Sequence, residues 1–201
     1  MSKLSVVSYN VNGVRSAVSK GLLDWLSNNQ PDVVCLQEIK IAADDFDEAP
    51  FKKIGYHSYL FPAVKKGYSG VAVLSKQKPD KVVKGIDIER YDNEGRNIRI
   101  DLGELSVMSA YFPSGTTGDE RQAVKMDYLD DFYNYIVGLK NTRSKLLVCG
   151  DFNICHKPID IHNPVANKDA SGFKPEEREW MEKLFSSGFI DTFRQFNKQP
   201  D

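Results

Sequence analysis

Apolar residues recur along the chain in short runs and in helical stripes, and the two patterns alternate. Residues 4–10 are apolar and β-branched, which is typical of a buried strand, and residues 33–36 form a second run of this kind. Between these runs, residues 17–28 cluster their apolar side chains on one side, which predicts a helix with Trp25 in the core. This strand–helix–strand opening predicts a layered α/β fold.

Further strands are predicted wherever a short apolar run ends in glycine or in a polar turn. Two of these runs are separated only by Gly103 and Glu104, which predicts a tight hairpin. The expected strands cover residues 56–61, 70–75, 80–86, 97–102, 105–111 and 145–150.

Two further helices are predicted in the second half of the chain. Residues 119–140 carry aromatic and aliphatic side chains at helical spacing, which predicts core packing along one face. Pro175 favours the first turn of a helix that extends to about residue 186 and places Trp180 in the core. We find no repeat, low-complexity tract or linker, so a single domain over residues 1–201 is expected.

Charge and cysteine content limit the class of protein. The 27 Lys and Arg residues are balanced by 28 Asp and Glu residues, which excludes a generally basic nucleic-acid coat but leaves room for a basic rim around an acidic site. The three cysteines have no regular spacing, and two of them lie in apolar runs, which favours small buried residues over disulfides. With no apolar signal segment or membrane span, a reduced cytoplasmic protein without a membrane partner is expected.

Polar side chains follow four of the predicted strands at the points where those strands end. Asn10 ends the first strand, Glu38 follows the second, Tyr111 ends a third, and Asp151 and Asn153 follow a fourth. We expect these side chains to meet in one polar pit, where Mg²⁺ would find the one or two carboxylates that it prefers. The alternative for any single position is an ordinary turn residue, and the joint occurrence favours the pit.

Other known signatures of function are weak or absent. His156 and His162, taken with Cys149 and Cys155, have spacings that fit no standard zinc site. The sequence contains no P-loop, GxGxxG or HExxH motif.

Seven short sequence motifs resemble those of a known family, and they occur in the same order along the chain as in that family. LQE and GDFN are moderately specific, whereas GFKPEEREWM followed by DTFR is far more so. The strings are SYNVNGVR, DVVCLQEIK, GYSGVAVLSK, SAYFPSG, GDFNICHKPIDI, GFKPEEREWM and DTFR. On these strings the chain resembles the exonuclease III family of apurinic/apyrimidinic endonucleases, within the wider endonuclease/exonuclease/phosphatase superfamily.

The resemblance implies a four-layer α/β sandwich of the DNase I type. It also implies a DNA-repair phosphodiesterase that uses Mg²⁺, or Mn²⁺ in its place, to hydrolyse the DNA backbone 5′ to abasic sites, with 3′-to-5′ exonuclease activity. The implied partner is double-stranded DNA with abasic sites or 3′ ends, and the implied state is a monomer. The alternatives are another nuclease or phosphatase of the superfamily, or a catalytically dead DNA-binding fragment.

The resemblance assigns a role to each residue of the expected pit. Glu38 matches the principal carboxylate ligand of the metal, and Asn10 matches an amide that helps to organise the site. Tyr111 matches a tyrosine that contacts the scissile phosphate. Asp151 matches an aspartate that activates or orients the attacking water, and Asn153 matches an amide that fixes phosphate and water.

Four further residues are expected to contact the substrate. Asn12 stands where some relatives carry an aspartate near the metal, and Asn167 matches an asparagine near the DNA backbone. Ala170 replaces a second asparagine of some relatives. Arg96 and Lys125 are candidates for contacts to backbone phosphates, and the alternative for both is a solvated surface charge.

The family pattern extends beyond Asp201, into an aromatic stretch, a further strand and a final SDH. On this resemblance the domain is expected to be C-terminally incomplete, as a fragment or as a natural short form. The 201-residue polypeptide by itself is expected to be inactive or nearly so, because the family's catalytic histidine and its aspartate partner lie in that continuation.

Overall fold

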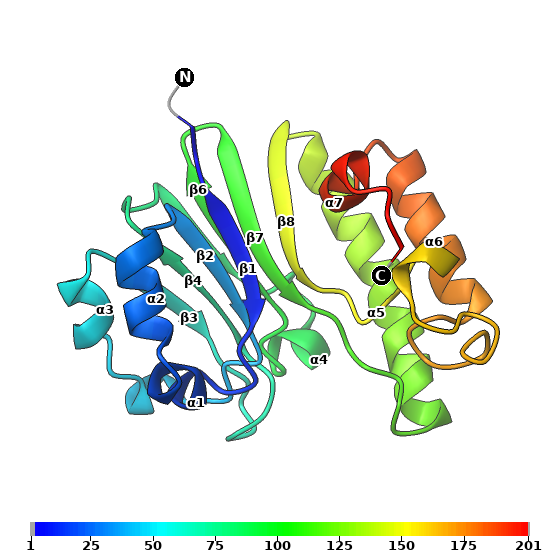
Figure 1. Cartoon of the computed structure of the whole chain (residues 1–201), viewed down its shortest axis with the longest axis horizontal. Helices are drawn as coiled ribbons and strands as arrows, with labels where there is room; N and C mark the ends of the chain where they lie inside the picture. Colours follow the sequence, from blue (N-terminus) through cyan, green and yellow to red (C-terminus); the bar gives the residue numbers. More distant parts are fainter. Residues whose placement is uncertain (1–2, 201) are drawn as a thin grey trace. The chain divides into compact units, whose positions relative to one another are not determined.

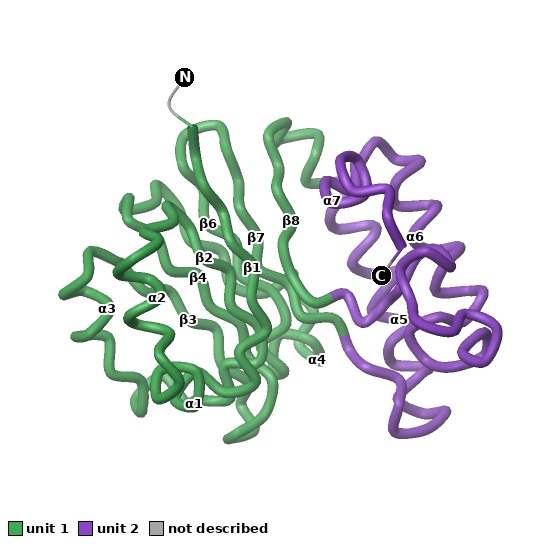
Figure 2. The backbone as a smooth tube through the Cα atoms, in the orientation of Figure 1, with its two compact units in different colours: residues 1–112, 139–151 green, residues 113–138, 152–201 purple. Residues whose placement is uncertain are grey.

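The computed structural model describes residues 3–200. The chain forms two compact units (Figure 2). The first unit comprises residues 1–112 and 139–151, and the second comprises residues 113–138 and 152–201. The mixed α/β class expected from the sequence is confirmed (Figure 1).

The first sheet of the first unit has the strand order β1-β2-β4-β3. Strands β1 and β2 are parallel, whereas β2 and β3 each pair with β4 in the antiparallel sense. Parallel neighbours need a crossover, and two helices supply it here. The elements are β1 (Val6–Asn10), α1 (Val14–Ser19), α2 (Leu22–Asn29), β2 (Val33–Gln37), η1 (Ala43–Asp45), α3 (Ala49–Lys53), β3 (His57–Phe61) and β4 (Val71–Ser75).

The single helix expected over residues 17–28 is wrong, because the structure has two helices there. Gly21 separates α1 from α2 with a φ of 97°, a left-handed conformation that glycine adopts without steric cost. The expected core position of Trp25 is also wrong, because its side chain is 43% exposed. An apolar stripe predicts which side of a helix faces the protein, but its outermost residue can still contact solvent.

The second sheet runs in chain order, β5-β6-β7-β8. The hairpin expected across Gly103 and Glu104 is confirmed, with Leu102 paired to Leu105. Strands β7 and β8 are parallel, and a long helix connects them. The elements are β5 (Lys81–Lys84), α4 (Glu89–Asp92), β6 (Asn97–Leu102), β7 (Leu105–Tyr111) and β8 (Lys145–Asp151).

Alternating side chains of β2 build two hydrophobic cores. Val34 and Leu36 pack with residues of α1, α2 and α3, which lie on one face of the first sheet (Figure 1). Val33 and Cys35 point the other way and pack against Ile98 and other apolar residues of the second sheet. Because both faces of β2 are covered, its run of apolar residues is continuous rather than alternating with polar ones.

The second unit is helical. The expected apolar stripe of α5 is confirmed, since Tyr128, Leu129, Phe132 and Ile136 are buried. Trp180 is buried as expected, and its Nε1 donates to the Leu129 carbonyl at 2.8 Å. The elements are α5 (Asp119–Lys140), whose last residues belong to the first unit, η2 (Pro158–Asp160), α6 (Pro175–Ser186) and α7 (Thr192–Phe196). Within residues 3–200, none of the helices has the length and apolar character that crossing a membrane requires.

Candidate active site

Four of the predicted site residues stand at strand ends of the first unit. Parallel pairing in the first sheet sets Asn10 beside Gln37, so Glu38 follows at the same edge. Parallel pairing in the second sheet sets Tyr111 beside Asp151. Because parallel strands that are in register end at the same edge of a sheet, the pairing itself gathers these polar residues.

The Asn10 amide connects the two sheets at this edge. Its Nδ2 donates to Glu38 Oε1 at 2.8 Å and to Asp151 Oδ2 at 2.8 Å. The oxygen of the same amide accepts the backbone N–H of Asn12 at 3.0 Å. A neutral donor therefore stands between two carboxylates and offsets part of their repulsion by giving a hydrogen bond to each.

The Glu38 carboxylate holds a cation in this structure, the ammonium group of Lys40. Lys40 Nζ lies 2.8 Å from Glu38 Oε2 and also donates to Asn12 Oδ1 at 2.5 Å. Glu38 and Lys40 both have left-handed backbones, with φ values of 54° and 48°. Such strained conformations cluster at functional sites. The sequence analysis did not single out Lys40, although it ends the string DVVCLQEIK.

The ionisation of Glu38 suits a cation-binding role. Burial by itself would raise the pKa of Glu38, but hydrogen bonds from Asn10, Lys40 and Tyr111 outweigh burial and lower it. The carboxylate therefore stays ionised at neutral and mildly acidic pH, which is the form that binds a metal ion.

The phenol of Tyr111 is kept protonated. Burial raises its pKa well above the ordinary value, and the hydrogen bond to the Glu38 carboxylate raises it further. A protonated phenol can donate a hydrogen bond to an anionic oxygen, whereas a phenolate would repel it. Tyr111 thus suits the expected contact with a phosphate.

Arg96 lies behind Tyr111 rather than on the surface. Its side chain is only 2% exposed, so the surface-charge alternative is wrong for this residue. The guanidinium donates to Glu94 Oε2 at 2.6 and 2.8 Å, to the Tyr68 hydroxyl at 3.0 Å and to the Tyr111 carbonyl at 3.2 Å. It also lies 4.7 Å from the centre of the Tyr111 ring.

Arg96 therefore holds Tyr111 in position, and the contacts of both residues with a phosphate stay predictions. Glu94 and Tyr68 were not found by sequence reasoning. Tyr68 does lie in the string GYSGVAVLSK, but its bond to Arg96 spans 28 positions, and no local pattern indicates it.

Three predicted residues belong to the second unit. Asn153 has a left-handed backbone with a φ of 51°, and its carbonyl accepts a hydrogen bond from Lys125 Nζ at 2.7 Å. Lys125 is fully buried and pairs with Glu177, so the surface-charge alternative is wrong for this residue, and its expected contact with a phosphate stays a prediction. Asn167 Nδ2 donates to the carbonyls of two residues of its own loop at 2.9 and 3.2 Å, and its contact with DNA stays a prediction.

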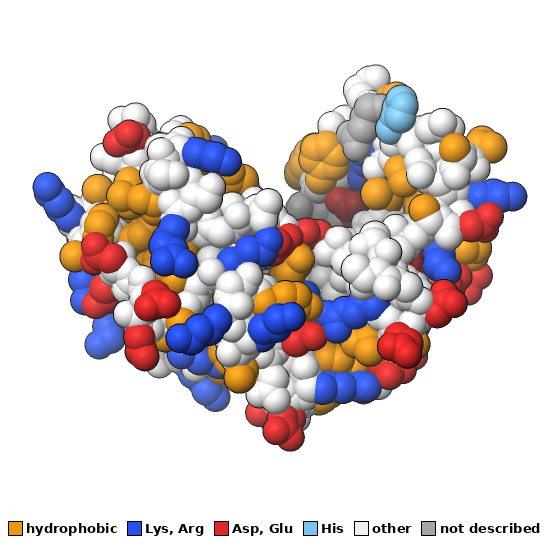
Figure 3. Space-filling view, turned by 90° about the horizontal axis from the view of Figure 1, so that it is seen from below, with side chains coloured by type: hydrophobic (Ala, Val, Ile, Leu, Met, Phe, Trp, Pro, Cys, Tyr) orange, Lys and Arg blue, Asp and Glu red, His pale blue; other side chains and the backbone are white. Residues whose placement is uncertain are grey.

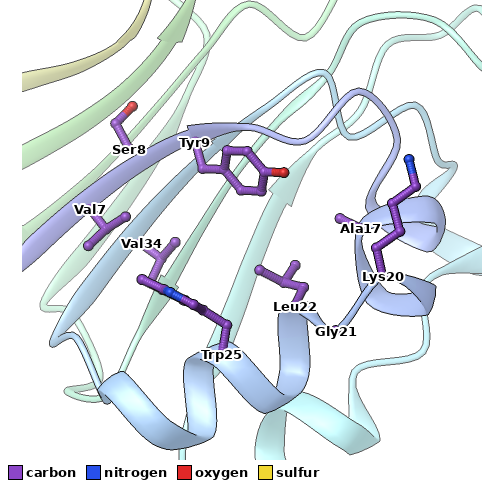
Figure 4. A pocket seen from close by; sticks show the side chains of 9 residues that line it. All are labelled: Val7, Ser8, Tyr9, Ala17, Lys20, Gly21, Leu22, Trp25 and Val34. Carbon is purple, nitrogen blue, oxygen red and sulfur yellow. The ribbon is translucent and has the colours of Figure 1, made fainter.

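A pocket of about 390 Å³ lies in the first unit (Figure 4). It is formed by β1, α1, α2 and β2, and most of its lining is apolar. Tyr9 and Trp25 both line it and are 50% and 43% exposed. None of the residues predicted to act in catalysis lines this pocket.

The residues at the strand ends fit a divalent cation of the magnesium type. Their donors are carboxylate and amide oxygens, which hard cations prefer, and Glu38 already binds an ammonium group. Within residues 3–200, no group of three or more His, Cys, Asp or Glu side chains is placed to hold a metal ion. Glu38 and Asn10 would therefore hold the ion together with water and substrate oxygens, as is usual for Mg²⁺.

Comparisons with known proteins place the chain in a family. An exodeoxyribonuclease of Bacillus subtilis is 40% identical over 95% of this chain and 75% of its own. A DNA-(apurinic or apyrimidinic site) endonuclease of Dictyostelium discoideum is 36% identical over 98% of this chain, which spans only 54% of that protein. The structure of an AP endonuclease from Archaeoglobus fulgidus superposes with a TM-score of 0.89 at 34% identity, over 96% of this chain and 74% of that one.

These likenesses confirm the predicted fold class, the DNase I-like fold. The Endonuclease/Exonuclease/phosphatase family matches residues 7–200, nearly the whole length of the chain. The chain therefore belongs to the endonuclease/exonuclease/phosphatase family and is a hydrolase of the DNA-repair nuclease kind.

Proposed function

We propose that this site serves to hydrolyse the DNA backbone 5′ to abasic sites and at 3′ ends, with Mg²⁺ as its cofactor and Mn²⁺ as a substitute. The observation that carries this proposal is the Asn10 amide, which holds the carboxylates of Glu38 and Asp151 on either side of it. One carboxylate is thereby available for a cation while the other stays close by for a proton.

When bound, the metal ion neutralises charge that develops on the phosphate oxygens and orients the substrate. Glu38 is the principal residue to hold it, because hydrogen bonds keep its pKa low. In this arrangement the metal ion replaces the Lys40 ammonium group at Glu38. Lys40 is then free to bind a substrate phosphate or to keep its hydrogen bond to Asn12.

The remaining residues act on water and phosphate. Asp151 accepts the proton of the attacking water or orients that water, with its Oδ2 fixed by Asn10. Tyr111 donates its phenolic hydrogen to a phosphate oxygen, and Arg96 fixes the Tyr111 ring. Asn153 is assigned to phosphate and water.

The proposed partner is double-stranded DNA that carries an abasic site or a 3′ end. Because a missing base removes most of the cost of unstacking, a pocket for the flipped sugar gives selectivity. On the face drawn in Figure 3, Lys and Arg side chains are interspersed with Asp and Glu side chains. A few basic residues and amides therefore supply the affinity for DNA, and this affinity should fall as the salt concentration rises. A monomeric state and a cytoplasmic location belong to the same proposal.

The test is cleavage of an end-labelled abasic duplex under single-turnover conditions, with protein in excess over DNA. The expected result is slow cleavage 5′ to the abasic site, in keeping with the low activity expected of the polypeptide by itself. This cleavage should require Mg²⁺, stop with EDTA and be lost in Glu38→Gln. The matched control is Glu179→Gln, which removes an exposed carboxylate of α6.

Binding of the duplex without cleavage would favour the alternative, a catalytically inactive DNA-binding module. Cleavage of a phosphate monoester in preference to DNA would favour a phosphatase of the same family. Metal-independent cleavage, or cleavage that survives Glu38→Gln, would overturn the assignment of this site.

A further inference from the structure

We propose that the buried ion pair of Lys125 and Glu177 is a positioning device for Asn153. Lys125 then acts on the reaction through the backbone of Asn153 and not by touching DNA. The inference rests on the proposed function, in which Asn153 binds phosphate and water, and it assigns new roles to residues of α5 and α6.

The pair is unusual because both charges are removed from water. Lys125 Nζ lies 2.6 Å from Glu177 Oε1, and both side chains are 0% exposed. Removing two charges from water costs free energy that their attraction often fails to return, so a buried pair is weak evidence for stability alone. A second role for the pair is therefore worth testing.

Helix capping explains why Glu177 is buried, but it does not explain why Lys125 is buried. Glu177 Oε2 accepts the backbone N–H groups of Gly172 at 2.7 Å and Lys174 at 3.0 Å, as expected of a glutamate in the first turn of a helix. Its Oε1 accepts Gln122 Nε2 at 3.0 Å. A neutral glutamine could cap the helix in the same way, so capping requires no buried ammonium group.

The same ammonium group reaches Asn153. Lys125 Nζ donates to the Asn153 carbonyl at 2.7 Å, and a charged donor makes a stronger bond than a neutral one. The Asn153 backbone is left-handed, a conformation that asparagine adopts more readily than most L-residues but that still costs free energy relative to the right-handed one. Fixing this carbonyl fixes the orientation of the peptide and hence the direction in which the Asn153 side chain leaves the backbone.

The loop before α6 closes over the same carbonyl. A Cβ atom added to Gly172 would lie 3.1 Å from the Asn153 oxygen, so the loop approaches closely because this residue is glycine. The Gly172 carbonyl in turn accepts the backbone N–H of Cys155 at 2.7 Å. Glu177, its loop and Lys125 thus hold residues 153–155 from two directions.

The experiment separates charge balance from positioning. Lys125→Met with Glu177→Gln removes both charges together and avoids an unpaired buried ion, whereas Lys125→Met alone leaves one. A second neutral pair, Lys125→Gln with Glu177→Gln, keeps the test available if the first does not fold. The control is Trp180→Phe, which breaks the buried bond from Trp180 to Leu129 between the same two helices. Each variant is measured by melting temperature, by the ¹H–¹⁵N signals of Asn153, and by kcat and KM on an abasic duplex with Mg²⁺.

We expect the single variant to melt earlier and the neutral pair to recover the melting temperature of the control. The neutral pair should still displace or broaden the Asn153 signals and lower kcat by about 10²-fold, as small misplacements of reacting groups do, with KM within a few-fold of wild type. A neutral pair with wild-type Asn153 signals and the kcat of the control would overturn the positioning role. If the wild-type chain cleaves no DNA, the proposed function fails, and the Asn153 signals still decide the role of the pair.

Discussion

The side chains of Asn10 and Asp151 are joined by a hydrogen bond of 2.8 Å although 141 positions separate them in the chain. Asn10 ends β1 of the first sheet and Asp151 ends β8 of the second, so this bond connects the two sheets at the candidate site. Asn10 Nδ2 also donates a hydrogen bond to Glu38 Oε1, again at 2.8 Å. The geometry of the two carboxylates thus depends on a single amide.

Asn10→Ala should therefore affect both stability and metal binding. Loss of a donor to two half-buried carboxylates should lower the free energy of unfolding by about 1–3 kcal/mol. The Glu38 pKa, which hydrogen bonds now hold low, should rise, so Mn²⁺ binding should be lost at a higher pH than in wild type when the pH is lowered. Urea denaturation measures the loss of stability. Mn²⁺ titrations at several pH values between about 4 and about 7, a range that includes the ordinary pKa of a glutamate, measure the change in metal binding.

Asn29→Ala is the matched control for Asn10→Ala, because it removes an exposed amide that donates to the Trp25 carbonyl. It should leave the pH dependence of Mn²⁺ binding unchanged. An Asn10→Ala variant that behaved like this control would mean that the amide does not govern the two carboxylates.

Glu38→Gln should weaken metal binding while leaving the fold intact. The variant keeps an oxygen for Asn10 but loses the charge that holds the cation, and altering even the partners of metal ligands costs about 10–100-fold in affinity or activity. Since the metal neutralises charge chiefly in the transition state, turnover should fall more than DNA affinity. Calorimetric Mg²⁺ titration, circular dichroism and DNA-binding assays measure the three effects. Most of the turnover surviving at limiting Mg²⁺ would remove Glu38 from the ligand role.

Much of the fold could be predicted because its signals are local. The hairpin of β6 and β7 and the helix α5 follow from turn residues and periodic apolar positions within one segment. The break at Gly21 was missed because a glycine beside an apolar stripe does not by itself show that its φ is positive.

The candidate site was only partly accessible from the sequence. Strand ends and motifs pointed to Asn10, Glu38, Tyr111 and Asp151, which the structure joins by hydrogen bonds. The supporting contacts of Arg96 and Lys125 were not predicted, because the partners of these residues are distant in the chain. Lys125 is the clearest example: its partner Glu177 lies 52 positions away, and a lysine on a helix is ordinarily solvated.

Tyr56→Phe should lower the stability of the protein at neutral pH, and this loss should become smaller at high pH because the wild-type phenol is buried. Tyr56 is 1% exposed, and its hydroxyl donates to the Pro31 carbonyl at 2.6 Å. The variant leaves that carbonyl unpaired and should lose about 1–2 kcal/mol near pH 7. Burial raises the pKa of Tyr56 from 10 to about 12, so the unfolded state loses this proton first.

The stabilising contribution of Tyr56 is therefore complete below pH 10 and disappears as the pH rises toward 12. The difference in melting temperature between wild type and Tyr56→Phe should shrink over that range. Tyr9→Phe is the control, because Tyr9 is 50% exposed. A difference that stays constant from pH 9 to pH 11.5, roughly the range around the ordinary tyrosine pKa, would show that the Tyr56 phenol is not protected from ionising.

Gly150→Ala should damage both the second sheet and the site. A Cβ atom added to Gly150 would lie 1.9 Å from the Ala110 carbonyl oxygen, and the Ala110 backbone is held between two neighbouring strands, so it cannot easily move aside. We expect a loss of about 3 kcal/mol or more, because this clash exceeds ordinary overpacking. Gly138→Ala is the matched control. Nothing lies within 4 Å of its added Cβ, and alanine in α5 should stabilise the helix by about 0.5–1 kcal/mol.

The two glycine variants also differ in what they do to the catalytic groups. Gly150 immediately precedes Asp151, so any displacement of β8 that relieves the clash moves this carboxylate away from Asn10. Gly150→Ala should therefore lose its metal-dependent cleavage even under conditions in which it remains folded, whereas Gly138→Ala should keep it. Urea denaturation combined with single-turnover assays at low temperature separates the two losses. Wild-type stability in Gly150→Ala would mean that β7 and β8 are not packed as closely as the structure has them.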